Sequence, residues 1–277
     1  MPDRTETIEK HDFNQYFTDE TAVKYHEKSE KKEIVPQAVK EAEKQVVVPV
    51  KKQKKPISAK KMGLRQMIQK VYHEVSGMNA EMKASLGDIE DAFDVIIWGD
   101  SANGKTNFGL EMMVQICQAL HSKAMYISWE EGHGKSFRDA LMRQDVYNRI
   151  GNSMEIMDGG TFAEIKAKIN RRKSPKVWVF DSIQASGFTQ REYFDLKHSF
   201  VMSRRKKIFI VVSWAKGKQP YGATAEAIKY YANIKIPVEK FIAFPKGRYG
   251  GNKNFIIWEE GAKKAWGMKN YKKHKDK

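Results

Sequence analysis

The sequence predicts an α/β fold, in which a mainly parallel central sheet is covered by helices on both faces. Short, β-branched apolar segments alternate with segments of helical periodicity between residues 94 and 238, and this alternation is typical of βαβ units. A glycine-rich motif at 99–106, GDSANGKT, joins the first of these strands to the first helix. The last apolar segments follow one another without a helix, so the sheet is expected to end in antiparallel strands.

The sequence before and after this alternation has a different composition. Residues 1–60 mix Glu and Lys runs with few large apolar residues, too few to offset the entropy of ordering, and are expected to be disordered. Apolar residues at helical spacing predict a helix over 61–84 that leads into the core, which is expected to span 85–262. The Lys-rich residues 263–277 are expected to form a basic, solvated tail.

The motif at 99–106 predicts a nucleotide site. Residues 94–98 suit a buried parallel strand and residues 105–120 a helix, so the backbone N–H groups of the first helical turn can converge on the β- and γ-phosphates. Lys105 adds a cation, and the hydroxyl of Thr106 is a Mg²⁺ ligand in this P-loop, or Walker A, pattern. The residues expected to bind ATP are Gly99, Asp100, Ser101, Ala102, Asn103, Gly104, Lys105, Thr106 and Asn107.

The remaining elements follow in alternation. Further strands are predicted at 123–129, 153–157, 176–181, 207–214, 232–238, 240–244 and 254–258. Helices are predicted at 135–149, 161–171, 190–204 and 223–231. Because the carboxyl ends of parallel strands lie at one edge of a sheet, residues that follow these strands are expected beside the phosphate loop.

Acidic residues end two of these strands. Strand 123–129 is followed by Glu130 and Glu131, and one carboxylate there can orient and deprotonate an attacking water. The pair can equally be solvated loop charges. Strand 176–181 ends at Asp181, which is placed either to hold Mg²⁺ through water or to cap the next helix.

Composition narrows the classes of partner. The net charge of +16 favours a polyanionic partner such as nucleic acid. The single cysteine, Cys117, excludes a disulfide framework and a Cys-pair zinc finger, and is expected to pack in the core. No apolar run approaches ~18 residues, and the charged N-terminus lacks the apolar region of a signal peptide. We expect a cytoplasmic protein with no membrane contact.

Four segments in order, GDSANGKT, ISWEEG, VFDSIQ and KGRYG, resemble the ATPase core of the RadA/Sms proteins, in the RecA-fold group that also contains DnaB-type helicases. The resemblance covers roughly residues 85–262 and implies a RecA-like P-loop NTPase that assembles as a homo-oligomeric ring or filament. It implies that Glu130 is the catalytic base, and that Lys246 and Arg248 reach into a neighbouring subunit's ATP site. The alternative for these two cations is exposure in a Gly-rich hairpin.

The resemblance does not extend to the zinc finger or the protease-like domain of RadA/Sms, so we expect a bare motor core like the single-domain recombinases of phages and mobile elements. Residues 100–103 replace a stretch that is usually richer in Pro and Gly. Ser213 and Trp214 stand at the strand end where RecA itself has a polar amide.

In RecA-fold recombinases the loops after the two central strands grip single-stranded DNA, and these correspond here to residues 186–191 and 215–224. Both combine basic and aromatic residues, which suits phosphate contact and base stacking; Phe188 is the aromatic residue of the first loop. The alternative is a pair of flexible polar loops. The expected DNA contacts are Arg191, Lys216, Lys218 and Tyr221.

The predicted function is that of an ATP-hydrolysing protein that acts on single-stranded DNA in recombination or replication. Two alternatives stay open. A DnaB-like helicase would unwind a forked substrate, whereas an ATP-gated helicase loader would turn ATP over slowly and require a replication or recombination protein as its partner.

Overall fold

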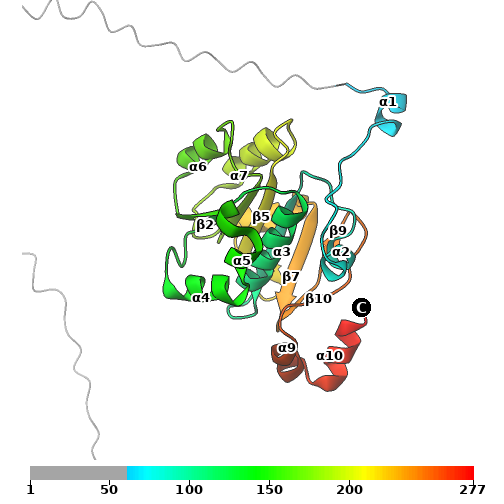
Figure 1. Cartoon of the computed structure of the whole chain (residues 1–277), viewed down its shortest axis with the longest axis vertical. Coiled ribbons are helices and arrows are strands. Elements are labelled where there is room, and N and C mark those ends of the chain that lie inside the picture. The colour runs from blue at the N-terminus through cyan, green and yellow to red at the C-terminus, as the bar shows by residue number, and fades with distance from the viewer. Residues whose placement is uncertain (1–60) are drawn as a thin grey trace, which may run out of the picture. The chain divides into compact units, whose positions relative to one another are not determined.

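The computed structural model describes residues 61–277 (Figure 1), so the predicted disorder of residues 1–60 lies outside the described residues. The strands are β1 Asp94–Gly99, β2 Ala124–Ser128, β3 Met154–Asp158, β4 Val177–Asp181, β5 Ile208–Lys216, β6 Gln219–Pro220, β7 Ile234–Glu239, β8 Ile242–Ala243, β9 Lys246–Gly247 and β10 Phe255–Ile256. The helices are α1 Leu64–Ile68, α2 Ala80–Leu86, α3 Lys105–Ala119, α4 Lys135–Arg143, α5 Val146–Ile150, α6 Phe162–Ile169, α7 Gln190–Leu196, α8 Ala223–Tyr231, α9 Glu259–Trp266 and α10 Met268–Lys275, with short helical turns η2 Gly151–Ser153 and η3 Lys197–Val201.

The predicted fold class is confirmed. The strands form one sheet in the order β10-β8-β7-β1-β5-β4-β2-β3, with β6 paired to β5 and β9 to β7. The neighbours from β7 to β3 are all parallel. The pairs that involve β6, β8, β9 and β10 are antiparallel. The phosphate-loop strand β1 is therefore central, and β5 separates it from β4.

Alternate residues of each strand face two helical layers, because successive strand side chains point to opposite faces. Val95 and Ile97 of β1 belong to the core shared with α2, α3, α4 and α5. Ile96 and Trp98 belong to the core shared with α6, α7, η3 and α8. Figure 1 shows α3 lying along the first of these faces. Cys117 of α3 is buried in the first core, as predicted.

A buried ion pair joins three elements at the amino end of β1. The Asp94 carboxylate lies 2.8 Å from Nζ of Lys197 in η3. It also accepts hydrogen bonds from the Tyr193 hydroxyl at 3.0 Å and from the backbone N–H of Asn233 at 3.1 Å. Because these partners satisfy the carboxylate, the charge can be buried without the penalty of an unpaired ion.

The prediction of one helix over 61–84 is wrong. The structure has the short helices α1 and α2, separated by an extended segment. In this segment the backbone of Glu74 forms an isolated antiparallel β-bridge with that of Glu90. No residue of α1 is buried, and Leu64 is 78% exposed, so the helical apolar pattern has no core to pack against. Between the helices, Val75 is fully buried and Gly77 has a φ of 98°, a left-handed conformation that ends a regular helix.

Most residues over 263–277 are exposed, as expected for a basic, solvated tail, but they form helices and not an irregular segment. Figure 1 shows α9 and α10 as a helix pair beyond β10. Tyr271 of α10 is buried with Ile242 of β8, and its hydroxyl donates to Glu259 at 3.0 Å. Lys263 pairs with the same carboxylate at 2.9 Å. The lysines of this segment thus lie on helices anchored by an aromatic residue. Within residues 61–277, no helix has both the length and the apolarity needed to cross a membrane.

Candidate nucleotide site and the adjoining hairpin

The phosphate loop connects the end of β1 to the start of α3. Gly104 is the N-cap of α3 with a φ of 94°, a conformation that residues with a side chain rarely adopt. The N–H groups of the first turn of α3 have no acceptor within the helix and face the loop. Asn103 accepts a hydrogen bond from the backbone N–H of Lys240 at 3.1 Å, so the turn between β7 and β8 holds the loop from outside.

This loop forms one side of a cavity of about 310 Å³, which we call the phosphate-loop cavity. Of the predicted ATP-binding residues, the cavity is lined by Ser101, Ala102, Gly104, Lys105, Thr106 and Asn107. Gly99 is the last residue of β1, and Asp100 and Asn103 lie in the loop, but none of the three lines the cavity. Glu130 and Asp181 line the cavity from the ends of β2 and β4. Both acidic residues therefore lie beside the phosphate loop, where the sequence places them.

Lys105 lies over the loop, where its Nζ donates to the backbone carbonyl of Asp100 at 2.9 Å. Burial lowers the pKa of Lys105, and the negative charges of Asp181 and Glu130 oppose that lowering. The ammonium group is thus held between the loop and two carboxylates. A polyphosphate in the cavity would replace the loop carbonyl as its partner.

Asp181 faces the first turn of α3. Its Oδ2 lies 3.4 Å from the Thr106 hydroxyl oxygen and also accepts a hydrogen bond from the Tyr126 hydroxyl of β2. Burial raises the pKa of Asp181 to about 6, the bond from Tyr126 opposes this, and Glu130 and Glu131 reinforce it. Asp181 therefore contacts Tyr126 and the first turn of α3. The alternative, in which Asp181 caps the helix that follows β4, required a different partner.

The oxygen atoms of Thr106 and Asp181 fit Mg²⁺, a hard cation that prefers oxygen ligands. Among residues 61–277 there is no group of three His, Cys, Asp or Glu side chains that could hold a metal alone. At nucleotide sites Mg²⁺ is usually bound by one or two protein oxygens, substrate phosphates and water.

The two glutamates after β2 differ in their partners. Glu130 accepts a hydrogen bond from the indole Nε1 of Trp214. Glu131 accepts one from the Ser136 hydroxyl of α4 at 2.6 Å, and its backbone N–H donates to Ser128 at 3.3 Å. Glu131 is thereby tied to α4, whereas Glu130 is bound to a side chain on β5.

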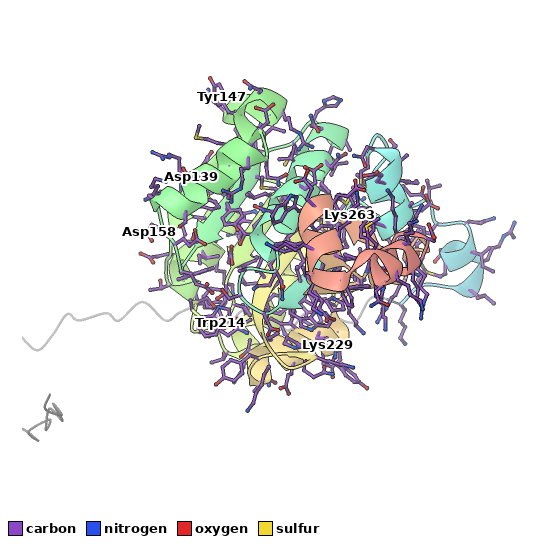
Figure 2. All side chains as sticks on the ribbon, turned by 90° about the horizontal axis from the view of Figure 1, so that it is seen from below. Asp139, Tyr147, Asp158, Trp214, Lys229 and Lys263 are labelled. Atoms are coloured by element: carbon purple, nitrogen blue, oxygen red, sulfur yellow. The ribbon has the colours of Figure 1, made fainter. Side chains whose placement is uncertain are left out.

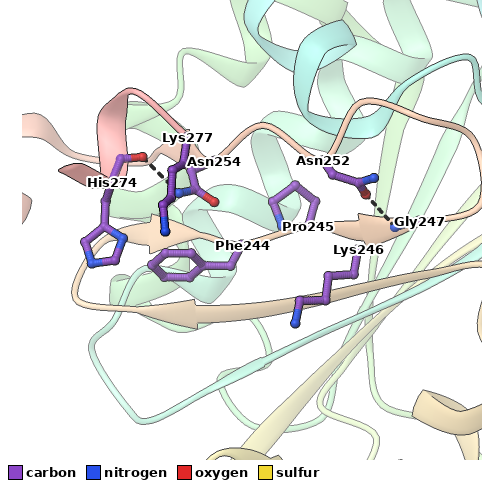
Figure 3. A pocket seen from close by; sticks show the side chains of 8 residues that line it. All are labelled: Phe244, Pro245, Lys246, Gly247, Asn252, Asn254, His274 and Lys277. Carbon is purple, nitrogen blue, oxygen red and sulfur yellow. Dashed lines mark hydrogen bonds between the residues drawn. The ribbon is translucent and has the colours of Figure 1, made fainter. Parts of the chain in front are cut away.

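Lys246 and Arg248 do not line the phosphate-loop cavity. Lys246 lies in β9 and pairs with Lys235 near the start of β7, toward the amino end of the parallel strands, whereas the phosphate loop lies at the carboxyl end. Figure 3 shows Lys246 beside Pro245 and Gly247. The backbone N–H of Gly247 donates a hydrogen bond to Oδ1 of Asn252 at 2.8 Å. Arg248 is exposed in the turn that follows β9. Their action on a neighbouring subunit stays a prediction.

Residues 215–224 begin as an ordered β-hairpin. β5 continues past the predicted end at 214 to Lys216, turns at Gly217 and Lys218, and pairs with β6 through Lys216 and Gln219. The hairpin is anchored by the Trp98 indole, which donates to the Lys218 carbonyl at 3.1 Å. The side chains of Lys216, Lys218 and Tyr221 are exposed.

The two predicted DNA loops are joined to each other. Gln190 donates to the carbonyl of Ala223 at 3.0 Å, and Thr224 donates to that of Phe188 at 3.0 Å. Phe188 itself is buried against Trp129, Phe162 and Phe180. The reading of Phe188 as an exposed aromatic of the first loop is therefore wrong, while Arg191 is exposed.

Sequence reasoning missed Gln184, Tyr126 and Arg143. Gln184, three residues past Asp181, donates to Ser213 at 2.8 Å and to the carbonyl of Tyr221 at 2.5 Å. The register of β2 and β4 pairs Asp181 with Ser128, and strand alternation then places Tyr126, two residues earlier, on the same face of the sheet. Arg143 lines the cavity from the end of α4, and helical spacing over 135–149 does not reveal which of its residues face the cavity.

Comparisons with known proteins add little. No protein-family profile and no curated protein matches the chain. Among solved structures, the chain is similar to the KaiC-like protein PH0186 from the hyperthermophilic archaeon Pyrococcus horikoshii OT3, with 16% identity, a TM-score of 0.47, and coverage of 64% of this chain and 88% of that chain.

Proposed function

We propose that the protein binds ATP with Mg²⁺ in the phosphate-loop cavity and hydrolyses it to ADP and phosphate. The observation that carries this proposal is the convergence of the phosphate loop, Asp181 and Glu130 on one cavity of about 310 Å³. The three parts come from the carboxyl ends of β1, β4 and β2, where ligands of open α/β sheets bind.

Different residues of the cavity have different roles in phosphoryl transfer. The first-turn N–H groups of α3 and Lys105 bind the phosphates. Thr106 and Asp181 would hold Mg²⁺, which neutralises charge on the phosphate oxygens when bound. Glu130 accepts a proton from the attacking water as its oxygen bonds to the γ-phosphorus. The bond to the bridging oxygen breaks, and ADP leaves with that electron pair.

We propose single-stranded DNA as the partner of the hairpin, in recombination or replication. Three exposed side chains of the hairpin segment, Lys216, Lys218 and Tyr221, and the exposed Arg191 in the first turn of α7 supply cations and a stacking face. The net charge of +16 supports a polyanionic partner. The resemblance to RadA/Sms supports assembly as a ring or filament, in which Lys246 and Arg248 would serve a neighbouring subunit.

The deciding experiment measures the ATPase rate with and without an oligodeoxythymidine. Lys105→Ala removes the cation of the phosphate loop and is expected to abolish ATP binding in titration calorimetry. Lys123→Ala, an exposed lysine at the opposite end of β2, is the matched control and should bind normally. ATP affinity that survives in Lys105→Ala would rule out the proposed site.

The same assay separates the alternatives. Turnover that DNA stimulates supports the proposal, and unwinding of a forked duplex would indicate a helicase. Binding of ATP with negligible turnover under both conditions would indicate a nucleotide-gated loader.

A further inference from the structure

Trp214 forms part of the wall of two cavities. One is the phosphate-loop cavity, and the other, of about 400 Å³, lies between the two predicted DNA loops. The lining of the second includes Gln184, Gly187, Tyr221 and Thr224. The Trp214 side chain is 41% exposed and is labelled at the edge of the molecule in Figure 2. A side chain shared by two cavities is positioned to link their occupancies.

The polar edge of the indole reaches the proposed catalytic base. Nε1 of Trp214 donates a hydrogen bond to Oε1 of Glu130. This is the one side-chain hydrogen bond of Glu130 within the described part of the chain. The bond occupies one oxygen of the carboxylate that is proposed to accept a proton from water. The contact also holds the carboxylate toward the hairpin.

The face of the indole depends on the hairpin. Its ring stacks on Tyr221, with ring centroids 6.4 Å apart and planes 19° from parallel. The backbone carbonyl of Trp214 accepts a hydrogen bond from the Tyr221 N–H at 2.9 Å. Gln184 joins the two residues further, since it accepts from the Trp214 N–H at 3.2 Å and donates to the Tyr221 carbonyl at 2.5 Å. Tyr221 is thus joined to Trp214 through its ring, its backbone N–H and Gln184.

We propose that Trp214 is a positioning residue that restrains Glu130, and that a single-stranded polynucleotide stacking on Tyr221 draws the indole away and releases the carboxylate. This inference rests on the proposed function and adds its regulation: occupancy of the hairpin sets the availability of the base. No covalent step is added, because water remains the nucleophile and Glu130 the proton acceptor.

Trp214→Phe tests the restraint, because phenylalanine keeps an aromatic ring beside Tyr221 and lacks the N–H donor. We expect the DNA-independent kcat for ATP to rise about tenfold, the factor that one hydrogen bond to a charged group can account for. The KM for ATP should stay unchanged, and an oligodeoxythymidine should stimulate the variant little further. Glu130→Gln in the same chain should abolish the gain, since the gain acts through that carboxylate.

Trp266→Phe is the matched control. The Trp266 indole nitrogen is buried without a hydrogen-bond partner in the described residues, so its kcat should equal that of the parent. An unchanged or lowered kcat in folded Trp214→Phe would overturn the restraint. If the parent protein hydrolyses no ATP, hydrolysis by Trp214→Phe would still support the restraint. Absence of hydrolysis in that variant would overturn it. ATP binding that does not require Lys105 would contradict the proposed function instead.

Discussion

Asp181 lines the phosphate-loop cavity, and its burial there lowers the free energy of unfolding when the carboxyl group is ionised. Its pKa of about 6 lies above the ordinary value of 3.8 because the carboxyl group is buried. Between pH 4 and 6 the folded chain therefore binds more protons at this residue than the unfolded chain does. The free energy of unfolding consequently falls as pH rises through this window, and the ionised group destabilises the folded state above pH 6.

Asp181→Asn is accordingly expected to stabilise the protein at pH 7, by about 1–3 kcal/mol, since the amide is neutral and its oxygen can still accept from Tyr126. The measurement is the melting temperature at several pH values, and the advantage should vanish near pH 4. Asp158→Asn, at the exposed end of β3, serves as the control and should change little. A lower melting temperature for Asp181→Asn at pH 7 would contradict this view of the carboxyl group.

The two neighbouring glutamates give a second residue-scale prediction. Glu130→Gln keeps the shape of the side chain and its hydrogen bond from Trp214 but removes the base, so ATP should bind normally and turn over at least about 100-fold more slowly. Glu131→Gln, whose carboxylate is tied to Ser136, should retain most of the rate. Single-turnover hydrolysis distinguishes them, and loss of activity in the Glu131 variant alone would place the base one residue later.

At the scale of elements, the strands β1, β2, β4 and β5 could be predicted because burial on both faces leaves continuous apolar runs. The helices were harder, because a periodic pattern does not reveal where the chain bends. The predicted helix over 135–149 breaks at Asp145, which has a φ of 49°. The break turns α5 so that Arg149 reaches Glu111 of α3, with Nη2 and Oε1 2.9 Å apart, a contact distant in sequence.

The β5–β6 hairpin carries the element-scale prediction. Replacement of Lys216 and Lys218 by Ala should weaken binding of single-stranded DNA and reduce the slope of log affinity against log salt by about 0.7 per lost phosphate contact. Tyr221→Ala should reduce affinity without changing the slope, because stacking releases few counterions. Fluorescence anisotropy over a salt series measures both.

The matched control replaces Lys272 and Lys273 of α10, which are exposed cations outside the hairpin. These substitutions keep the buried Tyr271, which a deletion of residues 263–277 would remove. If the α10 variant loses binding while both hairpin variants bind like the parent, the C-terminal helices contact the DNA and the hairpin does not.

At the scale of the whole molecule, the placement of Arg248 away from its own phosphate-loop cavity allows a role at a neighbouring subunit. Arg248→Ala should then bind ATP normally and lose turnover, by the ~10³–10⁵ that such a trans-acting arginine can be worth. Mixed with Glu130→Gln subunits, it should recover part of the activity, since some interfaces then contain both functional residues. Co-assembly without any recovery would show that Arg248 is only a surface charge.

The molecule as a whole also shows which parts of the site the sequence could predict. Asp181, Glu130 and the phosphate loop could be placed together, because strand ends in a parallel sheet meet at one edge. The contact between Trp214 and Glu130 could not, because it depends on how two side chains at the ends of separate strands are oriented. Burial of Phe188 likewise depends on aromatic partners from three different segments.

Cys117 makes this chain convenient for spectroscopic labelling. It is the sole cysteine of the sequence, it is 3% exposed in α3, and burial raises the pKa of its thiol to about 12. Since maleimides and similar reagents attack the thiolate, the native protein should react very slowly at neutral pH. A cysteine introduced at Lys218 would then be the one fast-reacting thiol, so a single fluorophore there could follow the hairpin through each turnover without prior removal of native thiols.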